Sequence, residues 1–188
     1  PWSGEVNTPP LQRLWASSAL SQIHAALTRD HLGLRPDAVI GYSSGESNSL
    51  FASGVWSDLD AMVCAADAGG LFTERLGGSF GVASELWGET ADWQTWTVLA
   101  PLADVRAEVA RHDRLYLSVI HSDRDCIIAG QATACEAAVE ALGRSRCLRL
   151  HYDLAVHCPL VAGLRESWLN LHRRPVAAGP HPRVYSAG

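Results

Sequence analysis

A strand-to-helix turn at residues 39–46, V-I-G-Y-S-S-G-E, is the feature that most constrains how this chain folds. Its first two residues are β-branched and apolar, which is typical of a buried strand, and the next five, G-Y-S-S-G, fit the pattern G-x-S-x-G of a nucleophile elbow. In an elbow the strand reverses sharply into a helix, and glycines two residues before and after the serine let strand and helix approach without Cβ clashes. The pattern therefore predicts an α/β fold with Ser43 at the start of a helix.

Ser43 and Ser44 are both candidates for chemistry in this turn, but only Ser43 has glycine on both sides at the required spacing. We therefore predict that Ser43 is a nucleophile. The free N–H groups and the dipole of a helix N-terminus favour a developing oxyanion, so the backbone N–H of Ser44 is the predicted oxyanion donor. A structural turn rich in Ser and Gly is the alternative interpretation, and the strand and helix predicted on either side argue against it.

A serine nucleophile needs a general base, and His157 has the best setting among the 8 histidines. It follows a predicted strand and precedes Cys158, Pro159 and a predicted helix, a position from which a side chain can point into a cleft. Taken by themselves, these residues favour an ordinary surface-loop histidine.

Hydrophobic periodicity predicts the other elements. Helices are expected at 8–32, 45–52, 57–68, 101–112, 133–142 and 159–172, and strands at 38–40, 96–100, 115–120, 126–129 and 147–156. Thr8 is the expected cap of the first helix, and residues 69–94 are expected to form loops and short helices. The order βαββαβ within residues 95–156 predicts a ferredoxin-like subdomain.

Composition excludes several classes of protein. The formal net charge of −5 provides no basic field for nucleic acid, and no apolar run is long enough to span a membrane. The 5 cysteines are scattered without C-x-x-C spacing and the 8 histidines show no H-E-x-x-H, so we expect neither a disulfide framework nor a metal site. This cysteine pattern suits a reducing cytoplasm. The chain does not begin with Met, and we expect it to be a piece of a longer polypeptide.

Four segments of the sequence resemble the malonyl-CoA:acyl-carrier-protein transacylase family, the acyltransferase domains of fatty acid and polyketide synthases. The elbow with the following L-F-A-S-G at 50–54 is similar to the family's G-H-S-x-G-E block, and L-G-L-R-P-D-A-V-I at 32–40 is similar to its lead-in strand. A-V-H-C-P-L at 155–160 resembles the block that carries the catalytic histidine, and V-Y-S-A-G at 184–188 resembles the strand that follows. The local sequence is most similar to acyltransferases of polyunsaturated-fatty-acid synthases and related iterative polyketide synthases.

The resemblance implies an α/β-hydrolase-like core at residues 1–94 and 157–188, incomplete at both ends, with the ferredoxin-like subdomain inserted at 95–156. It implies that Ser43 attacks an acyl-CoA thioester and that His157 accepts the proton, as a Ser-His dyad. The acyl-Ser43 ester would then be attacked by the phosphopantetheine thiol of an acyl carrier protein. No bound cofactor and no metal are expected, and the implied partners are acyl-CoA and a carrier protein within a larger multidomain synthase.

Three positions of the substrate site depart from the family pattern. Tyr42 stands where His is usual, and Val156 is smaller than the Phe of malonyl-specific members, which leaves room for a bulkier acyl chain. Ala68 stands where malonyl-selective members carry an Arg that pairs with the substrate carboxylate, and Arg75 could replace it only from a shifted helix. The family's G-Q-G-x-Q segment, a source of a second oxyanion donor, is not in the sequence. The acyl group is therefore left open.

Two other functions remain open beside acyl transfer to a carrier protein. One is a serine acyl hydrolase or thioesterase, which releases the acyl group to water, and the other is a catalytically inert domain that docks a carrier protein. Arg144, Arg146 and Arg149 either form a basic rim for CoA phosphates or an acidic carrier protein, or belong to an ordinary solvated face.

Overall fold

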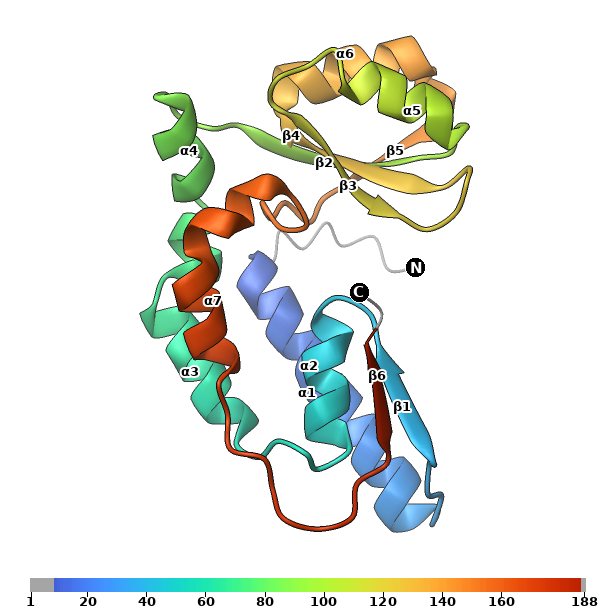
Figure 1. Cartoon of the computed structure of the whole chain (residues 1–188), viewed down its shortest axis with the longest axis vertical. Coiled ribbons are helices and arrows are strands. Elements are labelled where there is room, and N and C mark those ends of the chain that lie inside the picture. Colours follow the sequence, from blue (N-terminus) through green and yellow to red (C-terminus); the bar gives the residue numbers. More distant parts are fainter. Residues whose placement is uncertain (1–8, 187–188) are drawn as a thin grey trace, which may run out of the picture. The chain divides into compact units, whose positions relative to one another are not determined.

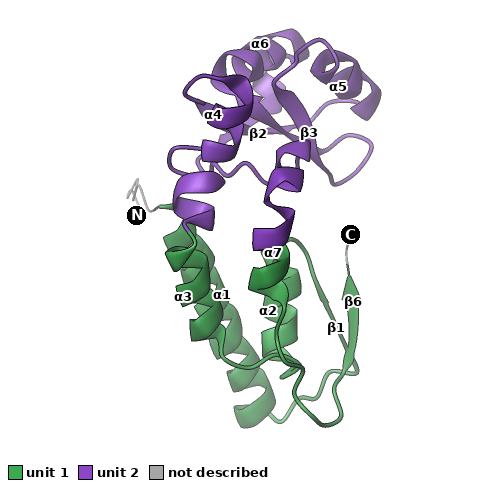
Figure 2. Ribbon diagram, turned by 60° about the vertical axis from the view of Figure 1, so that its left-hand side comes forward, with its two compact units in different colours: residues 1–69, 169–188 green, residues 70–168 purple. Residues whose placement is uncertain are grey.

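Residues from opposite ends of the chain form one sheet, in which β1 (Ala38–Gly41) pairs in parallel with β6 (Arg183–Ser186). The computed structural model describes residues 9–186 and divides into two units, residues 1–69 with 169–188 (unit 1) and residues 70–168 (unit 2) (Figure 2). The sheet of β1 and β6 belongs to unit 1. Thr8 and the last two residues of the closing segment V-Y-S-A-G lie outside the described residues.

Unit 1 also contains three helices, of which α2 lies beside the sheet (Figure 1). They are α1 (Pro10–Ala26), which continues into a π-helical turn at Leu27–His31, α2 (Ser44–Ala52) and α3 (Leu59–Ala68). The carboxylate of Asp58 caps α3 by accepting a hydrogen bond from the N–H of Ala61 at 3.0 Å. Helix α2 packs against both α1 and β1, so the predicted order of helix, strand, helix and helix is confirmed.

The apolar surface of unit 1 is covered unevenly. Leu11 at the start of α1 is 5% exposed, whereas Ile23 near its end is 62% exposed. Phe51 is buried and its ring meets Trp56 edge-on, with 5.5 Å between the ring centroids. Ile40 of β1 is 69% exposed. The small core of unit 1 therefore lies where the C-terminal end of α2 meets the segment that follows it, at the opposite end of the helix from the elbow.

Unit 2 is built on a four-stranded sheet with the order β3-β4-β2-β5, in which all neighbours are antiparallel. Its strands are β2 (Trp93–Val98), β3 (Leu115–Ile120), β4 (Cys126–Gln131) and β5 (Cys147–Leu150). Two helices, α5 (Leu102–Val109) and α6 (Ala132–Leu142), cover one face of it (Figure 1). The element order is therefore βαββαβ, as predicted, and the chain has mixed α/β content.

Alternation along the strands explains why the helices cover this particular face. Trp96 and Val98 of β2 point to the same side and are buried together with Ile128 of β4, Val105 of α5 and Val139 of α6. Full burial of each such aliphatic side chain contributes about 1.5–3 kcal/mol. This core is the main source of stability in unit 2.

Shorter elements complete unit 2. They are a π-helical turn (Leu71–Arg75), α4 (Gly81–Trp87) and two 3-10 segments (Arg144–Arg146 and Pro159–Leu164). Helix α7 (Arg165–His172) contains the boundary between the units. Within residues 9–186, no helix is long and apolar enough to cross a membrane.

Several predicted elements have the wrong bounds; the helix expected at 101–112, for example, ends at Val109. The strand expected at 147–156 ends at Leu150, because Asp153 pairs back with Arg149 and the next residues leave the sheet. The strand expected at 96–100 spans Trp93–Val98, since its ladder with β4 begins at Trp93. The helix expected at 159–172 is a 3-10 segment followed by α7.

Candidate functional site

Ser43 occupies the turn between β1 and α2 with a backbone conformation of φ 54° and ψ −123°. Residues other than glycine rarely adopt such a conformation, and it persists only where the surrounding structure imposes it. The side chain is exposed. The strand, strained serine and helix required of a nucleophile elbow are therefore present, and the catalytic role of Ser43 stays a prediction.

The two glycines of the elbow contribute differently. A Cβ atom on Gly41 would lie 2.0 Å from the carbonyl oxygen of Gly45, so the first turn of α2 can approach β1 only over a glycine. A Cβ atom on Gly45 would have nothing within 4 Å. The steric explanation of the pattern is therefore correct for Gly41 and wrong for Gly45.

Ser44 opens α2, and its N–H is not used by either hydrogen bond that closes the turn. Those bonds run from the N–H of Gly45 to the carbonyl of Tyr42 at 2.8 Å and from the N–H of Glu46 to the carbonyl of Ser43 at 3.0 Å. The first N–H groups of a helix carry partial positive charge. The N–H of Ser44 therefore lies at the positive end of α2, and its role as oxyanion donor stays a prediction.

Glu46 joins the first turn of α2 to β6. Its carboxylate accepts a hydrogen bond of 2.6 Å from the hydroxyl of Ser186, and Ser186 pairs with Gly41 in the sheet register. The side chain therefore fastens the strand beside the elbow to the helix behind it, a contact that the sequence did not predict.

Tyr42 and Ala68 are the other predicted site residues of unit 1. Tyr42 is exposed in the elbow, and desolvation raises the pKa of its phenol. Ala68 ends α3 and is exposed. Arg75, the alternative cation for a substrate carboxylate, lies in unit 2, where its guanidinium pairs with both carboxylate oxygens of Glu85, one at 2.8 Å.

His157 and Val156 belong to unit 2, in a segment without regular structure between β5 and the 3-10 segment at Pro159. His157 is exposed and has a left-handed backbone, with φ 55°. Val156 is half-buried. Burial raises the pKa of the Cys158 thiol that follows. Both predicted catalytic residues therefore sit at strained positions, one in each unit.

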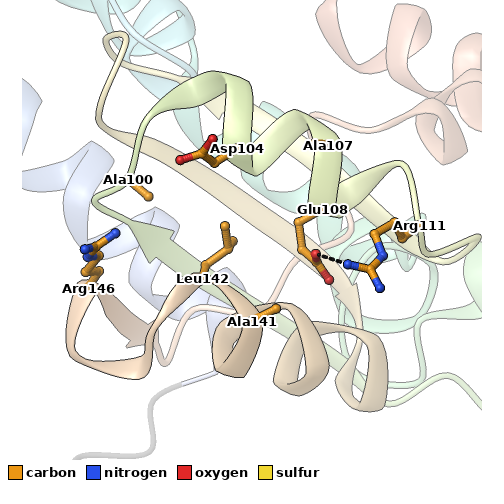
Figure 3. Close-up of a pocket in the computed structure, with 8 residues that line it drawn as sticks. All are labelled: Ala100, Asp104, Ala107, Glu108, Arg111, Ala141, Leu142 and Arg146. Carbon is orange, nitrogen blue, oxygen red and sulfur yellow. Dashed lines mark hydrogen bonds and ion pairs between the residues drawn. The ribbon is translucent and has the colours of Figure 1, made fainter.

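A pocket of about 320 Å³ lies between α5 and α6 (Figure 3). Asp104, Glu108 and Arg111 of the α5 side face Leu142 and Arg146 across it, and Arg111 donates to Glu108 at 3.2 Å. None of the predicted catalytic, oxyanion or substrate-binding residues lines this pocket, whereas Arg146 of the considered basic rim does. Among residues 9–186 there is also no group of three or more His, Cys, Asp or Glu side chains that could hold a metal ion.

The basic residues near β5 are largely paired with acids of their own unit. Arg144 pairs with Glu136 and with Glu140, the latter at 2.5 Å, and Arg149 pairs with Asp153. These contacts weaken the interpretation of a basic rim. Sequence reasoning missed Asp153, although its spacing of four residues from an Arg was visible.

The fold is that of the acyltransferase domains. The acyltransferase domain of an iterative polyketide synthase in enediyne biosynthesis matches 98% of this chain and 46% of its own length, with a TM-score of 0.65 and 24% identity. A malonyl-transacylase in complex with a type II polyketide synthase acyl-carrier protein matches 94% of this chain and 55% of its own, with a TM-score of 0.70 and 20% identity.

Sequence relatives lead to the same class. The chain is 32% identical over 148 residues to the spectinabilin polyketide synthase system protein NorA' of Streptomyces orinoci, which covers 77% of this chain and 4% of that protein. It is 28% identical over 174 residues to a polyunsaturated fatty acid synthase of Thraustochytrium sp., covering 86% of this chain and 8% of that protein. No protein-family model matches the chain. Fold and sequence together confirm the resemblance to acyltransferase domains of polyketide and polyunsaturated-fatty-acid synthases.

Proposed function

We propose that this chain transfers an acyl group from CoA to the phosphopantetheine thiol of an acyl carrier protein, through an ester on Ser43. The observation that carries the proposal is the conformation of Ser43, held at φ 54° where the first turn of α2 crosses Gly41. The relatives support the reaction class, because they are synthases of polyketides and polyunsaturated fatty acids. One structural neighbour is bound to an acyl-carrier protein, which supports that partner.

In the proposed reaction, the hydroxyl oxygen of Ser43 attacks the thioester carbonyl and His157 accepts the hydroxyl proton. The N–H of Ser44 donates to the oxyanion of the tetrahedral intermediate. The C–S bond breaks, and the CoA thiolate leaves with the proton held by His157. The carrier thiol then attacks the ester and gives its proton to His157, which returns it to the Ser43 oxygen as the new thioester departs.

The same proposal assigns the two units to parts of the family fold. Unit 1 corresponds to part of an α/β-hydrolase-like core, and the sheet β3-β4-β2-β5 with α5 and α6 corresponds to a ferredoxin-like subdomain at about residues 95–156, because all its strand pairs are antiparallel in that order. We also infer that the domain works within a multidomain synthase. A reducing cytoplasm suits its five free cysteines.

The acyl group that fits these residues carries no free carboxylate. Ala68 offers no charge at the end of α3, and Arg75 is already engaged by Glu85. Val156 leaves more room than a Phe beside His157. We therefore propose an uncharged acyl group as the preferred substrate.

The test follows the intact mass of the protein during incubation with a panel of acyl-CoAs. An acyl adduct that is lost in Ser43→Ala and retained in Ser44→Ala, which keeps its backbone N–H, supports the transferase. Free acid that accumulates without an adduct supports the hydrolase instead. A protein that neither forms an adduct nor releases CoA contradicts both enzymatic functions and leaves the docking domain.

A further inference from the structure

We propose that Arg149 and Asp153 form a clamp that positions His157, an inference that rests on the proposed role of His157 as the base. The clamp acts on the irregular segment between β5 and Pro159, which belongs to unit 2 together with both clamp residues. Neither residue is assigned to contact a substrate. Their role is to hold the backbone from which the imidazole projects.

The contact between the two side chains is bidentate. The guanidinium of Arg149 donates to the two carboxylate oxygens of Asp153 at 2.9 and 2.6 Å. The side chains are 20% and 24% exposed. A charge-assisted, forked pair that is mostly shielded from water is stronger and more directional than an exposed one, so Asp153 has a defined position.

Arg149 is itself fixed to the middle of the sheet. The same guanidinium donates to the backbone carbonyl of Thr95 at 3.1 Å, and it also donates to the carbonyl of Leu150. Thr95 lies on β2, which is hydrogen-bonded to β4 on one side and β5 on the other. The clamp therefore ties the segment to an internal strand of the sheet.

A second anchor follows immediately. Leu154 and Ala155 are buried, Ala155 with no exposed surface, and the N–H of Ala155 donates to the carbonyl of Leu76 at 2.7 Å. Beyond His157, the N–H of Val161 donates to the carbonyl of Cys158 at 3.2 Å. Val156 and His157 thus lie between the bond of Ala155 to Leu76 and the turn that opens the 3-10 segment.

This arrangement explains the backbone of His157. A left-handed conformation at a non-glycine residue is strained and relaxes unless its neighbours hold it. With Asp153 released, only the bond from Ala155 to Leu76 holds the upstream end of the segment. Each time that bond opens, the strain at His157 can relax by shifting the imidazole. Displacement of a catalytic group by about 1 Å can lower a rate by about 100-fold.

Asp153→Asn is the informative variant, and Glu140→Gln is its matched control. Both Arg149 and Arg144 lie over the ring of Trp96, at 6.0 and 5.7 Å from its centroid, so changing either arginine also disturbs the core. Changing the acid leaves both contacts with Trp96 in place. Glu140 pairs with Arg144 and is not in the segment that carries His157.

We expect Asp153→Asn to lower kcat for acyl transfer by about 10- to 100-fold with KM for acyl-CoA unchanged. Asp153→Glu, which keeps the carboxylate, should recover part of the loss, and Glu140→Gln should behave as the unchanged protein does. Hydrogen exchange at the amide of Ala155 should accelerate in Asp153→Asn alone. Ala155 follows the clamp by two residues, and its bond to the carbonyl of Leu76 should open more often once Asp153 is released.

An unchanged kcat in Asp153→Asn overturns the clamp, whatever happens to amide exchange. An equal loss of kcat in Glu140→Gln also overturns the clamp, because the loss then follows from any change of an acid in unit 2 and not from Asp153 in particular. If the unaltered protein transfers no acyl group, the proposed function fails. The exchange of Ala155 then still decides whether Asp153 holds the segment.

Discussion

A Cβ atom on Gly41 would lie 2.0 Å from the carbonyl oxygen of Gly45, so β1 and α2 meet too closely for any side chain at position 41. The peptide between them includes Ser43 in its strained conformation. The strain and the close contact have one cause, because the chain reverses from strand to helix within three residues. The elbow therefore depends on Gly41 more than on Gly45.

We predict that Gly41→Ala and Gly45→Ala have opposite effects on stability. Gly41→Ala should lower the free energy of unfolding by about 2–3 kcal/mol, because backbone atoms must move apart. Gly45→Ala should raise it by about 0.5 kcal/mol, since alanine suits a helix better than glycine does. Urea denaturation of the two variants measures both values. An equal loss in the free energy of unfolding for both variants would show that a Cβ atom at position 45 also meets other atoms.

The bond between Glu46 and Ser186 should couple the helix to the last strand. In a double-mutant cycle of Glu46→Ala and Ser186→Ala, we expect a coupling of about 1 kcal/mol in the free energy of unfolding. Ser53→Ala provides the control, because the Ser53 hydroxyl donates to the carbonyl of Leu50. A cycle of Ser53→Ala with Glu46→Ala should give no coupling. A coupling near zero between Glu46 and Ser186 would show that their hydrogen bond does not stabilise the contact between α2 and β6.

Stability should fall at alkaline pH through Cys135. Burial raises the pKa of this thiol from 9.0 to about 12, so it stays neutral in the folded chain while the unfolded chain ionises above about pH 9. The stabilisation is complete below pH 9 and is lost as the pH rises toward 12. We expect the free energy of unfolding to decrease more steeply over this range in the unaltered protein than in Cys135→Ala. Identical slopes would contradict the prediction.

The exposed Cys64 should be alkylated faster than the buried Cys135 in the folded protein. Cys64 lies on the surface of α3, whereas Cys135 is fully buried under the sheet. Because the thiolate is the reacting species, iodoacetamide at pH 8 should label Cys64 in the folded protein and leave Cys135 unlabelled. Peptide mass mapping before and after denaturation reads both sites. Labelling of Cys135 without unfolding would show that the core of unit 2 opens.

Ala68 should control acceptance of a charged acyl group. We expect the unaltered protein to form adducts from acetyl-CoA faster than from malonyl-CoA, and Ala68→Arg to raise the malonyl rate relative to acetyl by about tenfold, the value of one charge-assisted pair. Asp67→Arg, one position earlier on the same helix, is the control and should change the ratio less. A malonyl preference in the unaltered protein would show that another cation binds the carboxylate.

Local chemistry explains what could be read from the sequence. The strained serine after a short apolar strand follows from glycine spacing within a few residues, and the βαββαβ order of unit 2 follows from hydrophobic periodicity. Both signals arise between neighbours in the chain, so they need no knowledge of the fold. The candidates Ser43 and Ser44 came from such a short pattern, whereas His157 became the candidate base only through the family resemblance.

Contacts between distant residues decided the rest. The end of β5 at Leu150 depends on Asp153 folding back onto Arg149, which in turn reaches Thr95 on another strand. The pairing of β1 with β6 joins residues that are far apart in the chain. Hydrophobic periodicity carries no information about such partners, because a hydrogen bond or ion pair forms only once the intervening chain has brought the two groups together. The sequence therefore predicted the elbow serine, whereas the contacts of Asp153 with Arg149 and of Ala155 with Leu76 could be read only from the tertiary structure.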